Sequence, residues 1–467
     1  MSRQAGGEPM TLIVRNAAVV TVGGRFHADI GVRDGRIAQI GGAMGKAERE
    51  FDAEGRPVTP GGVDAHVHLT DPIPGDANFH WADDFESGTR AALAGGITTV
   101  GNMSFAAPDG TIADGIRHDD ELAGALSLAD YFLHPVLLQP SEENIACIAP
   151  LHEAGHTSIK FFLSFNNFDR HVQDFLTAMR IAKAHGGIAL IHCEDAAIMD
   201  CCCTILREAG RTDPRFYPEA RPVQSEVVAT QRAVGFAETT GCPTYVVHLA
   251  SARALEACHD GRRRGVPVYV ETRPIYLHLT RQRFEDEDGA KYAGAPPLRE
   301  QADVDALWAG VSFGNVDTLA SDHAPWLLAE KLDPAFDATN LRQGVADLET
   351  SMPMLYGAGV LTGRITLEQF VAVTATNPAK LFGLYPRKGA VAVGTDADLV
   401  VWDDDRVRTI DGASMHSRAD YSPYDGFEVR GWPKWVVSRG EVVVEGGIVV
   451  AKKGRGKLVW RGRHRGI

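Results

Sequence analysis

Short β-type segments occupy both ends of the chain. Residues 11–60 contain β-branched runs such as "TLIVRNAAVVTV" and "ADIGVRDGRIAQIGG", which are separated by Gly-Gly and Asp-Gly turns. The same pattern returns near the carboxyl terminus in "DADLVVWDDD", "WPKWVVSRGEVVVEGG" and "GKLVWRG". The two ends therefore predict the two halves of one β-sandwich domain, formed by residues 1–60 and 385–467.

The middle of the chain, residues 61–384, alternates short apolar runs with amphipathic stretches such as 81–96 and 174–187. Apolar runs bounded by Gly, Pro and polar residues are typical of strands buried on both faces of a parallel sheet. Eight runs over roughly 260 residues predict a (β/α)8 barrel. A doubly wound open sheet would alternate in the same way, but no GxGxxG follows the first strand, which disfavours a dinucleotide-binding domain. The predicted fold class is α/β, a TIM barrel with a smaller β-sandwich domain; the eight runs are 61–68, 96–104, 130–138, 157–165, 187–195, 243–251, 266–274 and 315–325.

Polar residues fall near the carboxyl ends of these predicted strands, where barrels carry their catalytic groups. His66 and His68 are two positions apart, so their side chains point to the same face of the first strand. Any one such residue can be a hydrogen-bonded core residue, but the set as a whole predicts a metal site. Imidazole and carboxylate ligands suit Zn²⁺, and also Mn²⁺ or Co²⁺. The predicted metal ligands are His66, His68, Lys160, His192, His248 and Asp322.

Lys160 lies inside the apolar run "TSIKFFLSF", where an ammonium group is costly to bury. One interpretation is a lysine that extends its charge to water from a strand end. The other is a modified or deprotonated lysine with a chemical role.

Composition narrows the classes of function. Of the 467 residues, 44% are hydrophobic and 23% are charged, which excludes a disordered tail protein, a collagen and a coiled coil. The net charge of 47 − 61 = −14 disfavours binding to nucleic acid. The sequence contains no run of about 18 apolar residues, so it predicts no transmembrane helix. Residues 1–11 show no secretion signal. We therefore expect a cytoplasmic protein with no nucleic-acid partner and no membrane partner.

Two local features carry no predicted chemistry. The run of basic residues from Lys452 to Arg465 is expected to be a solvated tail. The chain has seven cysteines, and Cys201, Cys202 and Cys203 are adjacent. We expect a buried or loop cluster there rather than a disulfide framework, in a reducing compartment.

The residues above resemble the amidohydrolase superfamily, in its cyclic amidase branch of hydantoinases, dihydropyrimidinases, allantoinases and dihydroorotases. The resemblance extends over nearly the whole chain. "PGGVDAHVHL" resembles the family's first strand, and "ETRPIYLHLT" and "APPLR" resemble the region of its seventh strand and its substrate loop. "DYSPYDGFEVRGWP" is similar to the C-terminal segment of hydantoinases and dihydropyrimidinases.

The resemblance implies a hydrolase with two divalent metal ions, zinc first and manganese or cobalt as alternatives. In the family's pattern Lys160 is carboxylated by CO₂ and becomes a bridging ligand. A metal-bridging hydroxide would open a cyclic amide ring, and Asp322 would be the catalytic residue that passes a proton to the leaving nitrogen. The partner would be a small cyclic amide or ureide, and the protein a homotetramer or dimer. His66, His68, Lys160 and Asp322 would hold one metal, and His192, His248 and Lys160 the other.

Three positions expected to bind substrate depart from the family pattern. Phe165 follows Lys160 by five positions, where dihydropyrimidinases and many D-selective hydantoinases have a hydroxyl-donating Tyr. Ala295 replaces a frequent Ser, and Gln343 replaces a frequent Asn. A hydantoin-like ring is favoured, while dihydropyrimidine is put in doubt. Allantoin and linear ureas, carbamates or amides stay open as alternatives.

Two further alternatives are disfavoured. A dihydroorotase usually has an Arg two positions after the second His, and this chain has Thr70 there. A non-catalytic scaffold of the dihydropyrimidinase type would have lost metal ligands, whereas all six are kept.

Overall fold

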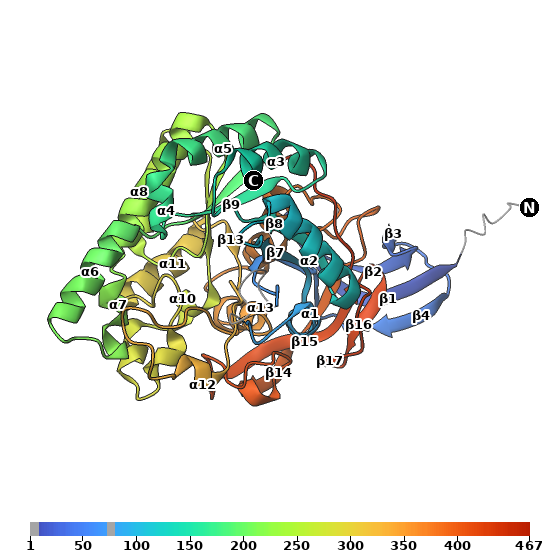
Figure 1. Cartoon of the computed structure of the whole chain (residues 1–467). Helices are drawn as coiled ribbons and strands as arrows, with labels where there is room; N and C mark the ends of the chain where they lie inside the picture. Colours follow the sequence, from blue (N-terminus) through green and yellow to red (C-terminus); the bar gives the residue numbers. More distant parts are fainter. Residues whose placement is uncertain (1–8, 72–79) are drawn as a thin grey trace, which may run out of the picture.

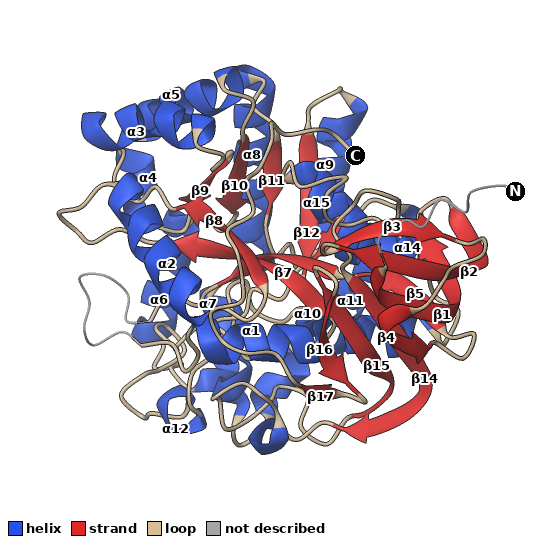
Figure 2. Ribbon diagram, turned by 90° about the vertical axis from the view of Figure 1, so that its right-hand side faces the viewer, coloured by secondary structure: helices blue, strands red, loops and turns tan. Residues whose placement is uncertain are grey.

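Eight parallel strands form the centre of the larger domain in the computed structural model, which describes residues 9–71 and 80–467 (Figures 1 and 2). The first three strands form one sheet and the other five a second sheet. Single parallel bridges, Val67 with His323 and Val136 with Lys160, join the sheets at both edges and close the eight strands into a ring. Each predicted apolar run contains one strand, which confirms the α/β barrel class. The strands are β6 (Gly62–Val67), β7 (Ile97–Ser104), β8 (Asp130–Pro135), β9 (Ser158–Phe162), β10 (Ile188–His192), β11 (Thr244–Val246), β12 (Val268–Thr272) and β13 (Thr318–Leu319).

Helices run along the outside of these strands (Figure 1). Several of them begin after a side chain that accepts amide N–H groups of the first turn, such as Asp84 before α1 and Ser251 before α9. The amphipathic stretches 81–96 and 174–187 correspond to α1 (Phe85–Ala94) and to most of α5 (Val172–Ala184). The other α-helices are α2 (Ile112–Leu126), α3 (Glu142–Glu153), α4 (Asn166–Arg170), α6 (Ala196–Glu208), α7 (Tyr217–Ala220), α8 (Val223–Thr240), α9 (Ala252–Arg263), α10 (Pro274–His278), α11 (Gln301–Phe313), α12 (Leu328–Lys331), α13 (Ser351–Leu355), α14 (Leu367–Val371) and α15 (Asn377–Leu381).

The smaller domain is a β-sandwich that both ends of the chain build, as predicted (Figure 2). Its N-terminal and C-terminal halves meet where β5 pairs antiparallel with β14, with Val58 opposite Val401. Buried aliphatic side chains of both halves share one core. The division at residues 60 and 384 stays a prediction, since β5 ends at Pro60 and β14 begins only at Leu399. The strands are β1 (Met10–Thr21), β2 (Gly24–Arg33), β3 (Arg36–Ile40), β4 (Ala47–Asp52), β5 (Pro57–Pro60), β14 (Leu399–Thr409), β15 (Glu428–Ser438), β16 (Glu441–Glu445) and β17 (Ile448–Val449).

The prediction of a solvated basic tail holds for Lys452, Lys453, Lys457, Arg463 and Arg465, which are exposed, but it was wrong for the residues around Arg461. Leu458 forms a parallel bridge with Tyr131 of β8, and Val459 is buried. The Arg461 guanidinium is also buried and donates to Ser158 Oγ at 2.9 Å and to Leu133 O at 2.7 Å. The segment packs against the barrel because its apolar pair extends the strand pairing and its arginine finds acceptors inside.

The prediction for Cys201, Cys202 and Cys203 was also wrong in its location. They lie on helix α6, where Cys201 is exposed and the other two are partly exposed, because successive helical residues point in different directions.

Among the described residues, no helix has the length and apolar character that a membrane span requires. Of the segment expected to lack a secretion signal, residues 1–8 lie outside the described residues.

A buried ion network joins the two domains. Lys388 Nζ donates to Asp130 Oδ2 at 2.6 Å and to Asp398 Oδ2 at 2.7 Å, and Asp396 Oδ2 lies 3.2 Å away. Arg439 Nε donates to Asp130 Oδ1 at 2.9 Å. Asp130 begins barrel strand β8, whereas Arg439 follows β15 of the sandwich, so the network connects them through charge-assisted hydrogen bonds.

We expect Lys388→Met to destabilise the protein by about 3–5 kcal/mol, because it leaves buried carboxylates without their cation. The measurement is the urea midpoint of unfolding. Lys434→Met is the matched control on β15, since Lys434 pairs with the exposed Glu54 and should cost at most about 1 kcal/mol. Equal midpoints for the two variants would contradict a role of this network in joining the domains.

Candidate metal centre

Six ligand-type side chains converge on one cavity inside the barrel, with a volume of about 460 Å³. His66 lies in β6 and His68 directly follows it, while His192 is the last residue of β10. His248 comes two residues after β11 and Asp322 three residues after β13. The carboxyl ends of parallel strands meet at one end of a barrel, which brings together side chains far apart in sequence. The six that line the cavity are His66, His68, Lys160, His192, His248 and Asp322.

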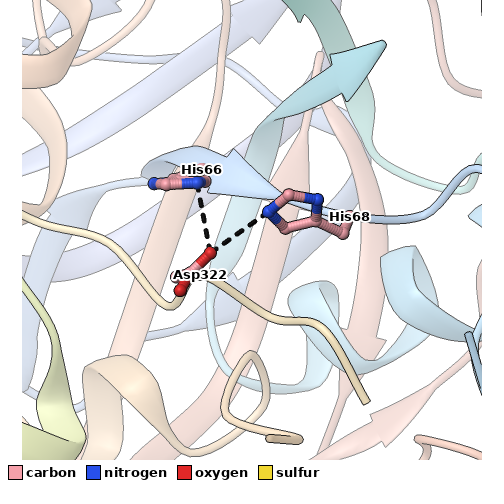
Figure 3. A group of neighbouring side chains, drawn as sticks. All are labelled: His66, His68 and Asp322. Carbon is pink, nitrogen blue, oxygen red and sulfur yellow. Dashed lines mark hydrogen bonds and ion pairs between the residues drawn. The ribbon is translucent and has the colours of Figure 1, made fainter. Parts of the chain in front are cut away.

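The Asp322 carboxylate lies close to the imidazoles of both His66 and His68. Its Oδ1 lies 3.1 Å from His66 Nε2 and 3.2 Å from His68 Nε2, and Figure 3 shows both rings turned toward it. One ligand atom from each of the three residues falls within 4.8 Å of the others. The other two histidines, His192 and His248, lie next to this group. The ring centroids of His66 and His248 are 5.5 Å apart, and those of His192 and His248 are 4.5 Å apart.

Two of these residues have a left-handed backbone, which is uncommon for residues other than glycine. φ is +39° at His248 and +48° at Asp322. Such a conformation costs free energy and persists where the surrounding structure enforces it, often at functional sites. Here the turn directly after the strand aims each side chain into the cavity.

Buried carboxylates fix the orientation of two imidazoles. Glu271 Oε1 lies 2.8 Å from His66 Nδ1, and Glu194 Oε2 lies 2.8 Å from His192 Nε2. A ring N–H directed at a carboxylate leaves the other ring nitrogen as a free lone pair for a metal. Burial lowers the pKa of both imidazoles, which favours the neutral form that binds metals.

The analysis of the sequence did not predict these two carboxylates, although the sequence contains a signal for each of them. Glu194 follows His192 by two residues, and Glu271 interrupts the apolar run of β12. A third residue that was missed is Arg273, whose fully buried guanidinium has NH1 3.0 Å from Asp322 Oδ2. Burial opposes ionisation of Asp322, but His66 and Arg273 nevertheless hold its pKa well below the ordinary value.

Lys160 is the third of the five residues of β9, so it lies deeper in the barrel than a strand end. Its side chain is fully buried, and Nζ forms no hydrogen bond with any described residue. Burial lowers the pKa of Lys160 to about 8. Its interior position argues against a lysine that extends its charge to water. An unmatched buried amine beside four imidazoles and a carboxylate fits a site for divalent cations.

The three positions expected to bind substrate line the same cavity. Phe165 precedes α4 and is 51% exposed, which puts it at the mouth. Ala295 belongs to an irregular segment with a cis peptide bond to Pro296. Gln343 lies in a second irregular segment, where its carbonyl accepts Trp326 Nε1–H at 2.8 Å. The rest of the wall is mainly apolar and includes Trp81, Phe105, Leu138, Phe162 and Ala324.

This fold and site define a class of protein, the barrel hydrolases with a metal centre at the carboxyl ends of the strands. The sequence model described as "Amidohydrolase family" matches residues 58–199 and 231–443. The chain therefore belongs to the amidohydrolase family.

Within this family, the chain is similar over its full length to hydantoinases. The D-hydantoinase of Ralstonia pickettii is 37% identical over 461 residues, which cover 98% of this chain and 100% of that protein. A solved D-hydantoinase structure has a TM-score of 0.93 at 37% identity, covering 98% of this chain and 100% of the other. The L-hydantoinase (dihydropyrimidinase) of Arthrobacter aurescens has a TM-score of 0.89 at 33% identity, with coverage of 97% and 100%.

Replacement of Glu271 tests the metal centre. We expect Glu271→Leu to weaken metal binding about 10- to 100-fold, because it removes the carboxylate that orients His66. Competition of Zn²⁺ with a chelator measures the affinity. Glu349→Leu is the matched control, since Glu349 is also a buried carboxylate paired with a histidine, His416, outside the cavity lining. The assignment fails if both variants bind Zn²⁺ like the unmodified protein.

Proposed function

We propose that this protein is a metal-dependent hydrolase that opens a hydantoin-like cyclic amide ring. The observation that carries the proposal is the convergence of four imidazoles, a carboxylate and a buried amine on one mostly apolar cavity. The full-length likeness to hydantoinases supports it. Allantoinase activity, or hydrolysis of a linear urea, carbamate or amide on the same scaffold, is the second candidate, since Phe165 has no hydroxyl to donate.

Two divalent ions, zinc first and manganese or cobalt as alternatives, would be the cofactors. His66, His68 and Asp322 would hold one ion, and His192 and His248 the other, with carboxylated Lys160 bridging them. The carboxylate would arise when the neutral Lys160 amine attacks CO₂, forming an N–C bond and releasing a proton. Its low pKa favours this reaction, because more of the amine is neutral near pH 7. Bound divalent cations would lower the pKa of a water molecule and polarise the scissile carbonyl.

Asp322 is proposed as the residue that moves the proton. The attacking water loses a proton to the Asp322 carboxylate as its oxygen bonds to the ring carbonyl carbon. The C–N bond then breaks, and Asp322 returns the proton to the leaving nitrogen, which gives a carbamoyl or ureido acid. Arg273 holds the second carboxylate oxygen at 3.0 Å and so keeps the side chain oriented through both transfers.

The lining favours a neutral ring with an apolar substituent. Trp81, Phe105, Phe162 and Phe165 supply aromatic surface, while Ala295 and Gln343 would contact the polar ring. Among the described residues of the lining, the only lysine or arginine is Lys160. A ring with a carboxylate, such as dihydroorotate, would therefore lack a cationic partner. The protein would act in the cytoplasm as a homotetramer or dimer.

The test is a hydrolysis panel with metal-loaded protein, followed by chromatography of the ring-opened product. We expect turnover of 5-substituted hydantoins, loss of turnover with a chelator and its return with Zn²⁺, Mn²⁺ or Co²⁺. Asp322→Asn should retain some metal but lose at least about 10²-fold in kcat, because it cannot shuttle the proton. Faster hydrolysis of an aryl urea would favour the linear alternative, and no hydrolysis of any ring would refute the proposal.

Lys160→Ala tests the carboxylated bridge. We expect loss of the metal pair and of turnover, with partial rescue of both by short carboxylic acids that occupy the vacated space. Metal content and turnover are measured with and without added acetate, and chloride at the same concentration is the control. Full activity without any addition would refute the role of Lys160.

A further inference from the structure

Lys331, the last residue of α12, is a buried cation outside the metal cluster. Its side chain is 1% exposed, and the charged groups that act on it are the guanidinium groups of Arg273 and Arg342. Nζ instead donates to three main-chain carbonyls, Ala293 O at 2.6 Å, Gly344 O at 3.0 Å and Arg342 O. Burial lowers the pKa of Lys331, yet three acceptors need three N–H donors, which only the ammonium form has.

The three carbonyls belong to the two irregular segments that form one wall of the catalytic cavity. Segment 293–296 contributes Ala295 to the cavity lining, and segment 342–344 contributes Gln343 and Gly344. Neither segment is part of a helix or strand, so no regular ladder fixes their separation. The ammonium touches both of them, and beside it Gly344 N–H donates to Ala293 O at 3.0 Å.

Two tyrosines and an arginine also contact segment 293–296. Tyr217 Oη–H donates to Gly294 O at 2.9 Å, and Tyr276 Oη–H donates to Pro296 O at 2.6 Å. A Cβ added to Gly294 would lie 3.3 Å from Arg273 NH1, so the segment runs closely past the guanidinium that pairs with Asp322. A displacement of segment 293–296 would therefore alter both the substrate wall and the surroundings of Asp322.

We propose that Lys331 is a positioning residue for substrate, whose ammonium fixes segments 293–296 and 342–344 relative to each other. It thereby sets the shape of the wall that receives the ring. The proposal rests on the proposed function only for what the wall binds. The linkage between the segments is a property of the protein itself and can be measured without turnover.

Lys331→Met keeps the aliphatic stem and removes the three donors. For a 5-substituted hydantoin we expect KM to rise at least tenfold, with kcat changed less than threefold and the content of bound metal unchanged. Lys291→Met is the matched control, because Lys291 lies two residues before Ala293, and its ammonium pairs with Asp288. A KM within twofold of the unmodified protein for Lys331→Met would overturn the proposal.

Chemical rescue separates hydrogen-bond donation from simple loss of packing. In Lys331→Ala, ethylammonium should restore KM toward the original value, because it supplies a cation with N–H groups. Tetramethylammonium, which has the charge but no N–H, should not restore it. Equal rescue by both cations, or rescue by neither, would overturn the assigned donor role.

Hydrogen exchange of the full-length protein without substrate gives a readout independent of activity. In Lys331→Met, peptides covering 293–299 and 342–345 should exchange faster, and those covering 60–68 should not change. If Lys331→Met does not fold, Lys331→Gln, which keeps two N–H donors, takes its place in both measurements. Unchanged exchange in both segments refutes the linkage, whereas failure of the unmodified protein to open any ring refutes only the proposed function.

Discussion

The site depends on the contacts that the Asp322 carboxylate makes with both of its oxygens. One of its oxygens faces His66 and His68, and the other faces the Arg273 guanidinium. Asp322 comes just after β13, His66 lies in β6 with His68 directly after it, and Arg273 follows β12. One carboxylate therefore connects the two strands that flank β13. The bridge between Val67 and His323 closes the ring at the same point. The junction between β13 and β6 that helps to close the barrel therefore also brings His66, His68 and Asp322 together.

Burial of the charged groups in the cavity shifts their pKa values and also costs free energy. A charge removed from water is expensive unless a partner compensates it. Asp322 has Arg273, and Glu194 has Arg221, so these carboxylates stay ionised in the interior. Lys160 Nζ forms no hydrogen bond with any described residue, and burial lowers the pKa of its amine to about 8. The same principle holds outside the site, where Lys388 neutralises buried carboxylates between the two domains.

The sequence was informative wherever a local pattern carried the information. The eight strands could be predicted because apolar runs between polar punctuation need no knowledge of distant residues. His66 and His68 could be recognised because alternation along a strand puts them on one face. Arg273 could not, because its partner Asp322 follows a neighbouring strand and is 49 positions away in the chain, from 273 to 322. The basic tail was misjudged for a related reason, since a run of charges does not reveal the bridge of Leu458 to Tyr131 that draws the segment inward.

The division of labour within the cavity follows from the same distinction. The six proposed metal ligands lie in the strands or within three residues of a strand end, where the neighbouring hydrogen-bonded ladder holds the backbone closely. The positions proposed to bind the substrate, Phe165, Ala295 and Gln343, line the cavity from irregular segments, whose separation no ladder sets. The Lys331 ammonium links the two segments 293–296 and 342–344, because it donates to one carbonyl of the first and two of the second. A single lysine at the end of a four-residue helix gives no signal in a sequence, so residues of this kind emerge only when the carbonyls around them are seen.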